Sequence, residues 1–194
     1  KRIIREVSAS IQVGDMGVGF LRFPHGELSA NPPHAEMVKH NARFIRGNHD
    51  NPAACARHSQ WIPDGRYDPV TKTMFVGGAD STDKQYRIQG YSWWEDEELS
   101  YLDLMALIEQ YEILRPEIMV THDAPQPIAH EVIRPLLMQN YAKFETTRTR
   151  QAFTQMLAIH QPKLWVFGHY HVSFDATVDG TRFVCLAELE YKDL

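Results

Sequence analysis

Two histidines separated by one residue follow an apolar run near the end of the chain. The stretch LWVFGHYH covers residues 164–171, and its first four residues are apolar, as in a strand covered on both faces. Side chains at positions i and i+2 of a strand point to the same face, so an extended backbone would bring His169 and His171 to one spot, ~6–7 Å apart along the strand. The alternative is a loop that carries two solvated histidines. Only the first interpretation gives the two imidazoles a shared partner.

The same arrangement recurs along the chain. Five apolar runs end in Gly or Thr and continue into polar residues: 10–15 (SIQVGD), 43–50 (RFIRGNHD), 74–81 (MFVGGADS), 118–125 (IMVTHDAP) and 164–171. They predict buried strands, and in α/β sheets the ligand site lies beyond the carboxyl ends of the strands. The side chains placed at these ends are Asp15, Asn48, His49, Asp50, His122, Asp123, His169 and His171.

Carboxylate, amide and imidazole groups form a donor set suited to Mn, Fe, Zn, Co or Ni. Each stretch has an ordinary alternative when taken alone. The Gly-Asp pair is typical of a turn, GNHD of a turn with a helix cap, and THDAP of a helix entry with Asp123 as the cap and Pro125 in the first turn. Four strand ends that each carry a metal-compatible side chain favour a metal site over coincidence.

The segments between these runs predict an α/β fold with an antiparallel edge. Helical spacing of apolar residues predicts helices at 96–114 and 147–161, and a third within 126–140. The pair Asp179-Gly180 divides 175–189 into two alternating runs, which predicts a hairpin. Residues 55–95 are interpreted as an irregular insertion with loops and one strand, within a single domain that spans 1–194.

The bulk composition is that of an ordinary globular domain. The 194 residues are 43% hydrophobic and 23% charged, and the net charge of −5 argues against a dedicated nucleic-acid surface. No run approaches the ~20 apolar residues of a membrane span, and the basic first residues are not followed by the apolar region of a signal peptide. Cys55 and Cys185 are too few for a disulfide framework, so we expect free thiols and a cytoplasmic location.

The motifs resemble those of a known family. GD at 14–15, GNHD at 47–50, TH at 121–122 and GHYH at 168–171 occur in the order found in the calcineurin-like metallophosphoesterases. The resemblance covers about residues 8–190 and is closest to the small bacterial and phage-type phosphoesterases. It implies a metallophosphoesterase β-sandwich flanked by helices, with two divalent metal ions at the strand ends. Mn²⁺ is the first expectation, and Fe, Zn, Ni and Co stay open.

The resemblance assigns metal-binding roles to five side chains. Asp15 is similar to the carboxylate that bridges both ions. Asn48, His122 and His169 would complete one metal site, and His171 would bind the second ion.

The resemblance also implies roles in the reaction. His49 is similar to the family's non-ligand histidine, which assists the leaving group, and Asp50 would hold its ring in the right tautomer. Arg46 would contact a phosphate oxygen with its planar fork, or else form a surface salt bridge.

The implied function is hydrolysis of a phosphate mono- or diester by a metal-bound hydroxide. The alternative from another class is a catalytically inactive phosphoesterase fold that serves as a scaffold for protein interaction. The expected substrate is a phosphate ester of undetermined type. The net charge of −5 does not support a nucleotide or nucleic acid, although neither is excluded. No membrane partner is expected, and the sequence does not determine the oligomeric state.

Two departures from the family pattern stand out. The family's first motif, Asp-x-His, is absent, and the spacing of apolar residues in 1–7 is helical, so we predict that the sheet lacks its first strand in this chain. The second metal would then have only Asp15 and His171. In GDMGVG, Val18 and Gly19 stand where the protein Ser/Thr phosphatases of the family have Asp and Arg, which argues against that class.

Overall fold

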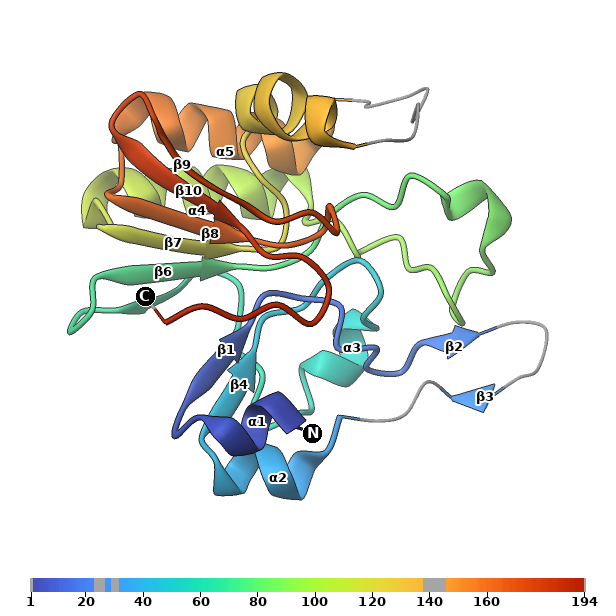
Figure 1. Cartoon of the computed structure of the whole chain (residues 1–194). Coiled ribbons are helices and arrows are strands. Elements are labelled where there is room, and N and C mark those ends of the chain that lie inside the picture. Colours follow the sequence, from blue (N-terminus) through green and yellow to red (C-terminus); the bar gives the residue numbers. More distant parts are fainter. Residues whose placement is uncertain (1, 23–26, 29–31, 138–145, 194) are drawn as a thin grey trace.

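The computed structural model describes residues 2–22, 27–28, 32–137 and 146–193, and its fold is mixed α/β (Figure 1). The main sheet has six strands in the order β5-β6-β7-β8-β10-β9. Their bounds are β5 (Arg66–Asp68), β6 (Thr73–Val76), β7 (Ile118–Thr121), β8 (Leu164–Phe167), β9 (Phe174–Val178) and β10 (Thr181–Cys185). Strands β6, β7, β8 and β10 are parallel, while β5 and β9 pair antiparallel at the two edges. The predicted α/β class with an antiparallel edge is confirmed.

Two smaller strand pairs accompany the main sheet. β1 (Ser10–Gln12) pairs in parallel with β4 (Ala42–Phe44), and β2 (Leu21–Arg22) pairs antiparallel with β3 (Glu27–Leu28). Each of the five apolar runs of the sequence therefore contains a strand, as predicted. The polar residues that follow β6, β7 and β8 lie at one edge of the main sheet, because the carboxyl ends of parallel strands meet there.

The apolar runs are continuous because both faces of the main sheet are covered. On β6, Met74 and Val76 belong to a cluster with the helices α4 (Tyr101–Leu114) and α5 (Arg148–Ile159), whereas Phe75 belongs to a second cluster with Ile45, which follows β4. Figure 1 shows α4 and α5 over one face and β1 and β4 on the other side of the sheet. The alternation follows from the period of two of a strand.

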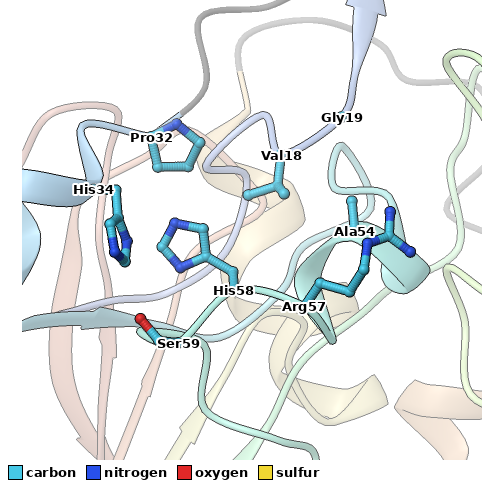
Figure 2. Close-up of a pocket in the computed structure, with 8 residues that line it drawn as sticks. All are labelled: Val18, Gly19, Pro32, His34, Ala54, Arg57, His58 and Ser59. Carbon is cyan, nitrogen blue, oxygen red and sulfur yellow. The ribbon is translucent and has the colours of Figure 1, made fainter.

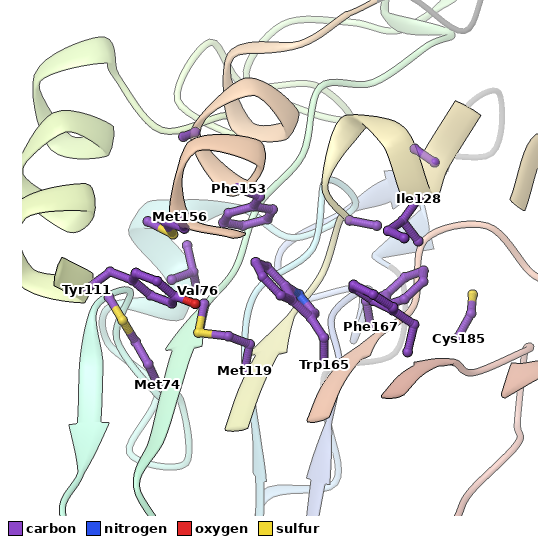
Figure 3. Packing of buried hydrophobic residues seen from close by; sticks show 14 of the residues in the cluster. Met74, Val76, Tyr111, Met119, Ile128, Phe153, Met156, Trp165, Phe167 and Cys185 are labelled. Atoms are coloured by element: carbon purple, nitrogen blue, oxygen red, sulfur yellow. The ribbon is translucent and has the colours of Figure 1, made fainter. Parts of the chain in front are cut away.

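The two long helices begin at side-chain caps. In α4 (Tyr101–Leu114) the Ser100 hydroxyl accepts the N–H of Asp103, and in α5 (Arg148–Ile159) the Thr147 hydroxyl accepts the N–H of Arg150. They bury their apolar faces in the main core (Figure 3), where for example the rings of Phe153 and Trp165 meet edge to face at 5.7 Å. Both predicted helices are confirmed, with the first starting later than expected.

The third predicted helix is only partly helical. Residues 126–140 contain a π-helical turn, η2 (Ile128–Ile133), and a 3-10 turn, η3 (Arg134–Leu136), while 138–140 lie outside the described residues. Pro135 lacks the N–H that a continuing α-helix requires, so the segment tightens there.

The segment 55–95 is less irregular than predicted. It holds two strands, β5 and β6, and the second was expected while the first was not. β5 has no apolar run of its own. It forms because Asp68 accepts the N–H of Val70 in a turn that returns the chain to pair Arg66 with Phe75. This hairpin is one edge of the main sheet, so the segment contains one strand more than predicted.

The remaining short elements are α1 (Arg2–Glu6), α2 (His34–Lys39), α3 (Pro52–Cys55) and the 3-10 turn η1 (Lys84–Tyr86). Of these, α1 matches the helical spacing predicted for 1–7. β9 and β10 form the predicted hairpin, in which Asp179 and Gly180 both have positive φ, 48° and 89°. Both cysteines are free and buried. None of the helices in the described part of the chain is long and apolar enough to cross a membrane.

Candidate metal centre

Four predicted donor side chains meet beyond the strand ends. The Asn48 Oδ1 atom lies 3.0 Å from His122 Nε2 and 3.0 Å from His169 Nδ1, and Asp15 Oδ1 lies 3.4 Å from His122 Nε2. Asn48, His122, His169 and Asp15 follow β4, β7, β8 and β1, respectively. The structure therefore brings together the donor set that the sequence predicted for one metal ion.

The spacing of these atoms suits a divalent ion. Neighbouring donors lie ~3.3–3.6 Å apart around a tetrahedral zinc with bonds of ~2.0–2.2 Å, and ~2.8–3.0 Å apart around a small octahedral ion. The observed contacts of 3.0–3.4 Å fall within this span. Among the described residues, no three His, Cys, Asp or Glu side chains already surround a single point. A metal site here would therefore depend on the Asn48 amide.

Two glycines make the close approach of these side chains possible. A Cβ atom on Gly14 would lie 2.1 Å from His122 Nδ1, and one on Gly47 would lie 2.1 Å from Asp15 Oδ1. Gly14 also has φ of +104°, which other residues rarely adopt. The glycines of GD and GNHD are thus required because the imidazole and the carboxylate occupy the space of a side chain.

Hydrogen bonds orient the donors toward one another. His122 Nδ1 lies 2.7 Å from the carbonyl oxygen of Val13, so a neutral ring carries its proton there and presents the lone pair of Nε2 to Asn48. The Asn48 Nδ2 group donates to Ser81 Oγ at 3.0 Å, which leaves Oδ1 facing the imidazoles. In that tautomer His122 Nε2 and Asn48 Oδ1, which lie 3.0 Å apart, can both bind one cation.

His169 and His171 do not share a face as predicted. β8 ends at Phe167, and the two histidines have φ of 68° and 57°, so the strand does not continue through them. His169 is half-buried among the donors, and desolvation of its ring lowers its pKa to about 3, which keeps the imidazole neutral. His171 is exposed, and within the described residues no hydrogen bond or ion pair joins it to Asp15.

Asp50 has different partners from those expected. Its carboxylate does not hold the His49 ring but accepts the backbone N–H groups of Met16, Val18 and Gly47 at 3.2, 2.9 and 2.8 Å. The side chain is fully buried, and burial, followed by the charge of Asp15, raises its pKa to about 6. Asp50 therefore fixes the loop after β1 against the loop after β4, which is a structural role.

His49 lies beside the donors and is held by residues that the sequence did not indicate. Its backbone N–H donates to Asp15 Oδ1 at 2.9 Å. Its ring stacks on Phe20, with centroids 5.1 Å apart and planes at 6°, and its Nε2 accepts from Arg87 Nη2. Burial lowers the pKa of His49. No local pattern in the sequence marks Phe20 or Arg87 as a neighbour of this ring.

Arg46 adopts neither of its expected roles. Only 3% of it is exposed, and its Nε atom pairs with Asp64 at 2.8 Å. Its Nη1 atom donates to the carbonyl oxygens of Asp96 and Glu97 at 3.0 and 2.7 Å. The guanidinium is therefore a buried crosslink between the end of β4 and the segment before α4, and it is neither free to contact substrate nor part of a surface salt bridge.

A buried chain of hydrogen bonds supports the Asn48 amide from behind. Ser81, which bonds to Asn48, donates its own backbone N–H to Glu97 Oε1 at 2.7 Å. Glu97 is 1% exposed, its Oε2 atom has no partner among the described residues, and burial raises its pKa to about 7. Ser81 ends the apolar run 74–81, so its position at a strand end was the available signal.

Replacing Glu97 with glutamine is expected to remove a pH-dependent loss of stability. The folded protein keeps the Glu97 proton up to about pH 7, whereas the unfolded chain releases it near 4.5. The free energy of unfolding therefore falls as pH rises between these values and stays lower above them. A glutamine side chain copies the neutral acid, so E97Q should match the wild type near pH 4.5 and exceed it above pH 7 by up to about 3 kcal/mol. Urea denaturation of both proteins in chelator, at several pH values, measures this; a difference that does not change with pH contradicts it.

Asp123 and Arg150 form a buried ion pair behind the two imidazoles. Arg150 Nε lies 3.1 and 2.9 Å from the two oxygens of Asp123, and the Tyr170 hydroxyl donates to Asp123 Oδ1. Burial alone would raise the pKa of Asp123, but the Arg150 charge and the hydrogen bonds hold it below its usual value. Because Asp123 follows His122 and Tyr170 follows His169, this pair fixes the backbone beside both donors.

A separate pocket of about 540 Å³ lies next to the loop that carries Asp15 (Figure 2). It is lined by Val18, Gly19, Pro32, His34, Ala54, Arg57, His58 and Ser59. The rings of His34 and His58 meet edge to face with centroids 5.0 Å apart. None of the predicted metal-binding or catalytic side chains lines it, so the pocket adjoins the centre without containing its donors.

Comparison with known proteins adds no relative to this description. No protein-family model matches the chain, and no curated protein matches it.

Proposed function

We propose that this protein is a metal-dependent phosphoesterase of the calcineurin-like type. The observation that carries the proposal is the convergence of Asn48 Oδ1 with the nitrogens of His122 and His169, beside the Asp15 carboxylate. Imidazole nitrogens and an amide oxygen that converge at these distances are donors that a divalent cation can use. The layered arrangement, with helices on one face of the main sheet and the β1–β4 pair on the other, supports the β-sandwich that the motif resemblance implies.

The donor set fits a first divalent ion, with Mn²⁺ as the leading candidate and Fe, Zn, Ni or Co as others. Asp15, Asn48, His122 and His169 would hold it. When bound, such an ion lowers the pKa of a water molecule from 15.7 toward ~7 and offsets the negative charge of a phosphate ester. A second ion would use Asp15 and His171, and for this site the exposed His171 must turn toward Asp15.

His49 is placed to assist the leaving group. It is next to Asn48 in the chain, and its backbone N–H binds the Asp15 carboxylate, so its ring lies beside the metal donors without being one of them. Its ring is fixed by Phe20 on one face and by Arg87 at Nε2. A fixed imidazole next to the reacting group can transfer a proton to the leaving oxygen.

Hydrolysis of simple phosphate esters tests the proposal. The purified protein supplied with Mn²⁺ should hydrolyse an aryl phosphate monoester or a bis-aryl diester, and a chelator should abolish the reaction. Restoring Mn²⁺ after chelation should recover it, which controls for damage by the chelator.

The absence of turnover on both esters with Mn, Fe, Zn, Ni and Co would contradict the enzymatic function. If metal still bound with the same ligand dependence, the result would favour the alternative, a phosphoesterase fold that serves as an inactive scaffold.

A further inference from the structure

The segment between β6 and α4 returns to the metal centre. Figure 1 shows it as a long green excursion that leaves the sheet, forms η1 and passes beside β2. The N–H of Leu21 donates to the carbonyl oxygen of Tyr91 at 3.0 Å, and Arg46 binds the carbonyls of Asp96 and Glu97. These contacts hold the segment against the loops that carry Asp15 and His49.

Arg87 is the residue of this segment that reaches the centre. Its side chain is 8% exposed, and its Nη2 atom pairs with Asp83 Oδ1 at 2.7 Å and donates to His49 Nε2. Its Cζ atom lies 5.6 Å from the centroid of the Phe20 ring, and its Nη1 atom contacts the carbonyl oxygen of Ser92 at 3.4 Å. The guanidinium therefore sits against the same aromatic ring on which His49 stacks.

Arg87 places a positive charge beside the metal donors. A guanidinium has donors but no acceptor, so Arg87 Nη2 donates and His49 Nε2 accepts in this contact. The negative partner present, Asp83, has a side chain that is 51% exposed. A phosphate oxygen beside this contact would accept hydrogen bonds from Arg87. It would also lie next to the metal donors, because the backbone N–H of His49 binds Asp15.

The other two buried arginines among the described residues have their partners away from His49. Arg46 is occupied by Asp64 and two carbonyls, and Arg150 by Asp123. Lys84 lies in the same turn as Arg87, but it is half exposed and pairs with Asp80. Arg87 is thus the cation that the described part of the chain places at His49.

We propose that Arg87 binds a non-reacting oxygen of the substrate's phosphoryl group, with Asp83 orienting the guanidinium. This rests on the proposed phosphoesterase function and deepens it, because it names the protein cation that recognises the phosphate. The planar fork of arginine suits two oxygens of one phosphate group, which a lysine cannot match.

Binding of inorganic phosphate tests this without turnover. Titration calorimetry of the full chain loaded with Mn²⁺ should detect phosphate, and R87A should weaken its binding roughly tenfold or more, since it removes charged hydrogen bonds. R87K should fall between the two. K84A, which removes the same charge in the same turn without a contact to His49, is the matched control and should stay within about twofold of the wild type. Metal content and thermal unfolding verify that each variant is folded, and R87Q replaces R87A if that variant is not.

The outcomes separate this inference from the function. Phosphate binding that is unchanged in R87A, equally lost in K84A, or absent in the wild type overturns the role of Arg87. Phosphate binding that depends on Arg87 in a protein that hydrolyses neither ester supports the role of Arg87 while it refutes the phosphoesterase activity.

Discussion

Replacing His169 with alanine is expected to remove the bound metal and to reduce ester hydrolysis to the background rate. The His169 imidazole is half-buried and neutral, and its Nδ1 atom lies 3.0 Å from Asn48 Oδ1, so alanine removes one of the converging nitrogen donors. Asp15→Asn should have the same effect because the amide weakens the one anionic donor. Elemental analysis of the purified variants and Mn²⁺-dependent hydrolysis of an aryl phosphate measure the two losses.

Two histidine variants act as controls for this experiment. His171→Ala removes an exposed imidazole two positions away and should retain the ion at the Asn48 site. His49→Ala should also retain metal but lose a factor of roughly 10²–10⁴ in rate, the usual contribution of a general acid. Its loss should be smaller for an aryl leaving group, which needs little protonation, than for an alkyl one. If His49→Ala loses metal as completely as His169→Ala, the assignment of the two roles is wrong.

Replacing Arg150 with methionine is expected to destabilise the fold by about 3–5 kcal/mol, because it leaves the Asp123 carboxylate buried without its counter-ion. Asp123 and Arg150 are 0% and 2% exposed, so water cannot compensate for the lost partner. The Tyr170 hydroxyl and the N–H of Ala124 remain as donors, but neither carries charge. Urea denaturation in the presence of chelator measures the change without a contribution from metal binding.

The matched control is an ion pair of similar geometry at the surface. Arg182 Nε lies 2.8 Å from Asp175 Oδ1, but its side chain is 47% exposed, so Arg182→Met should change the free energy of unfolding far less than Arg150→Met. The double variant Asp123→Asn/Arg150→Met should recover much of the stability, since no buried charge remains. A cost for Arg150→Met that equals that of Arg182→Met would show that the buried pair does not support the fold.

Local pattern was sufficient for the five strands of the apolar runs and for the four side chains that meet at the candidate metal centre. The runs that form β6, β7 and β8 are apolar because both faces of the main sheet are covered, and this requirement is visible in residues that are neighbours in the chain. Asp15, Asn48, His122 and His169 follow those strands directly, so the parallel arrangement that brings strand ends together also brings the donors together. The glycines at 14 and 47 were equally visible, although only the structure shows the side chains for which they make room.

The partners of these donors were decided by tertiary structure alone. Arg87 contacts His49, and Glu97 binds Ser81, which bonds to Asn48. Both residues lie in the long segment before α4, and the pattern of residue types does not predict which side chains such a segment buries. The backbone also decided the positions of two predicted residues. Positive φ values end the strand before His169, and His171 is exposed. The Asp50 carboxylate binds backbone N–H groups and not the His49 ring. Residue type and spacing thus indicate which side chains can bind a metal. Hydrogen bonds, burial and charge pairing between distant segments determine how those side chains are held, and they place Arg87 beside His49.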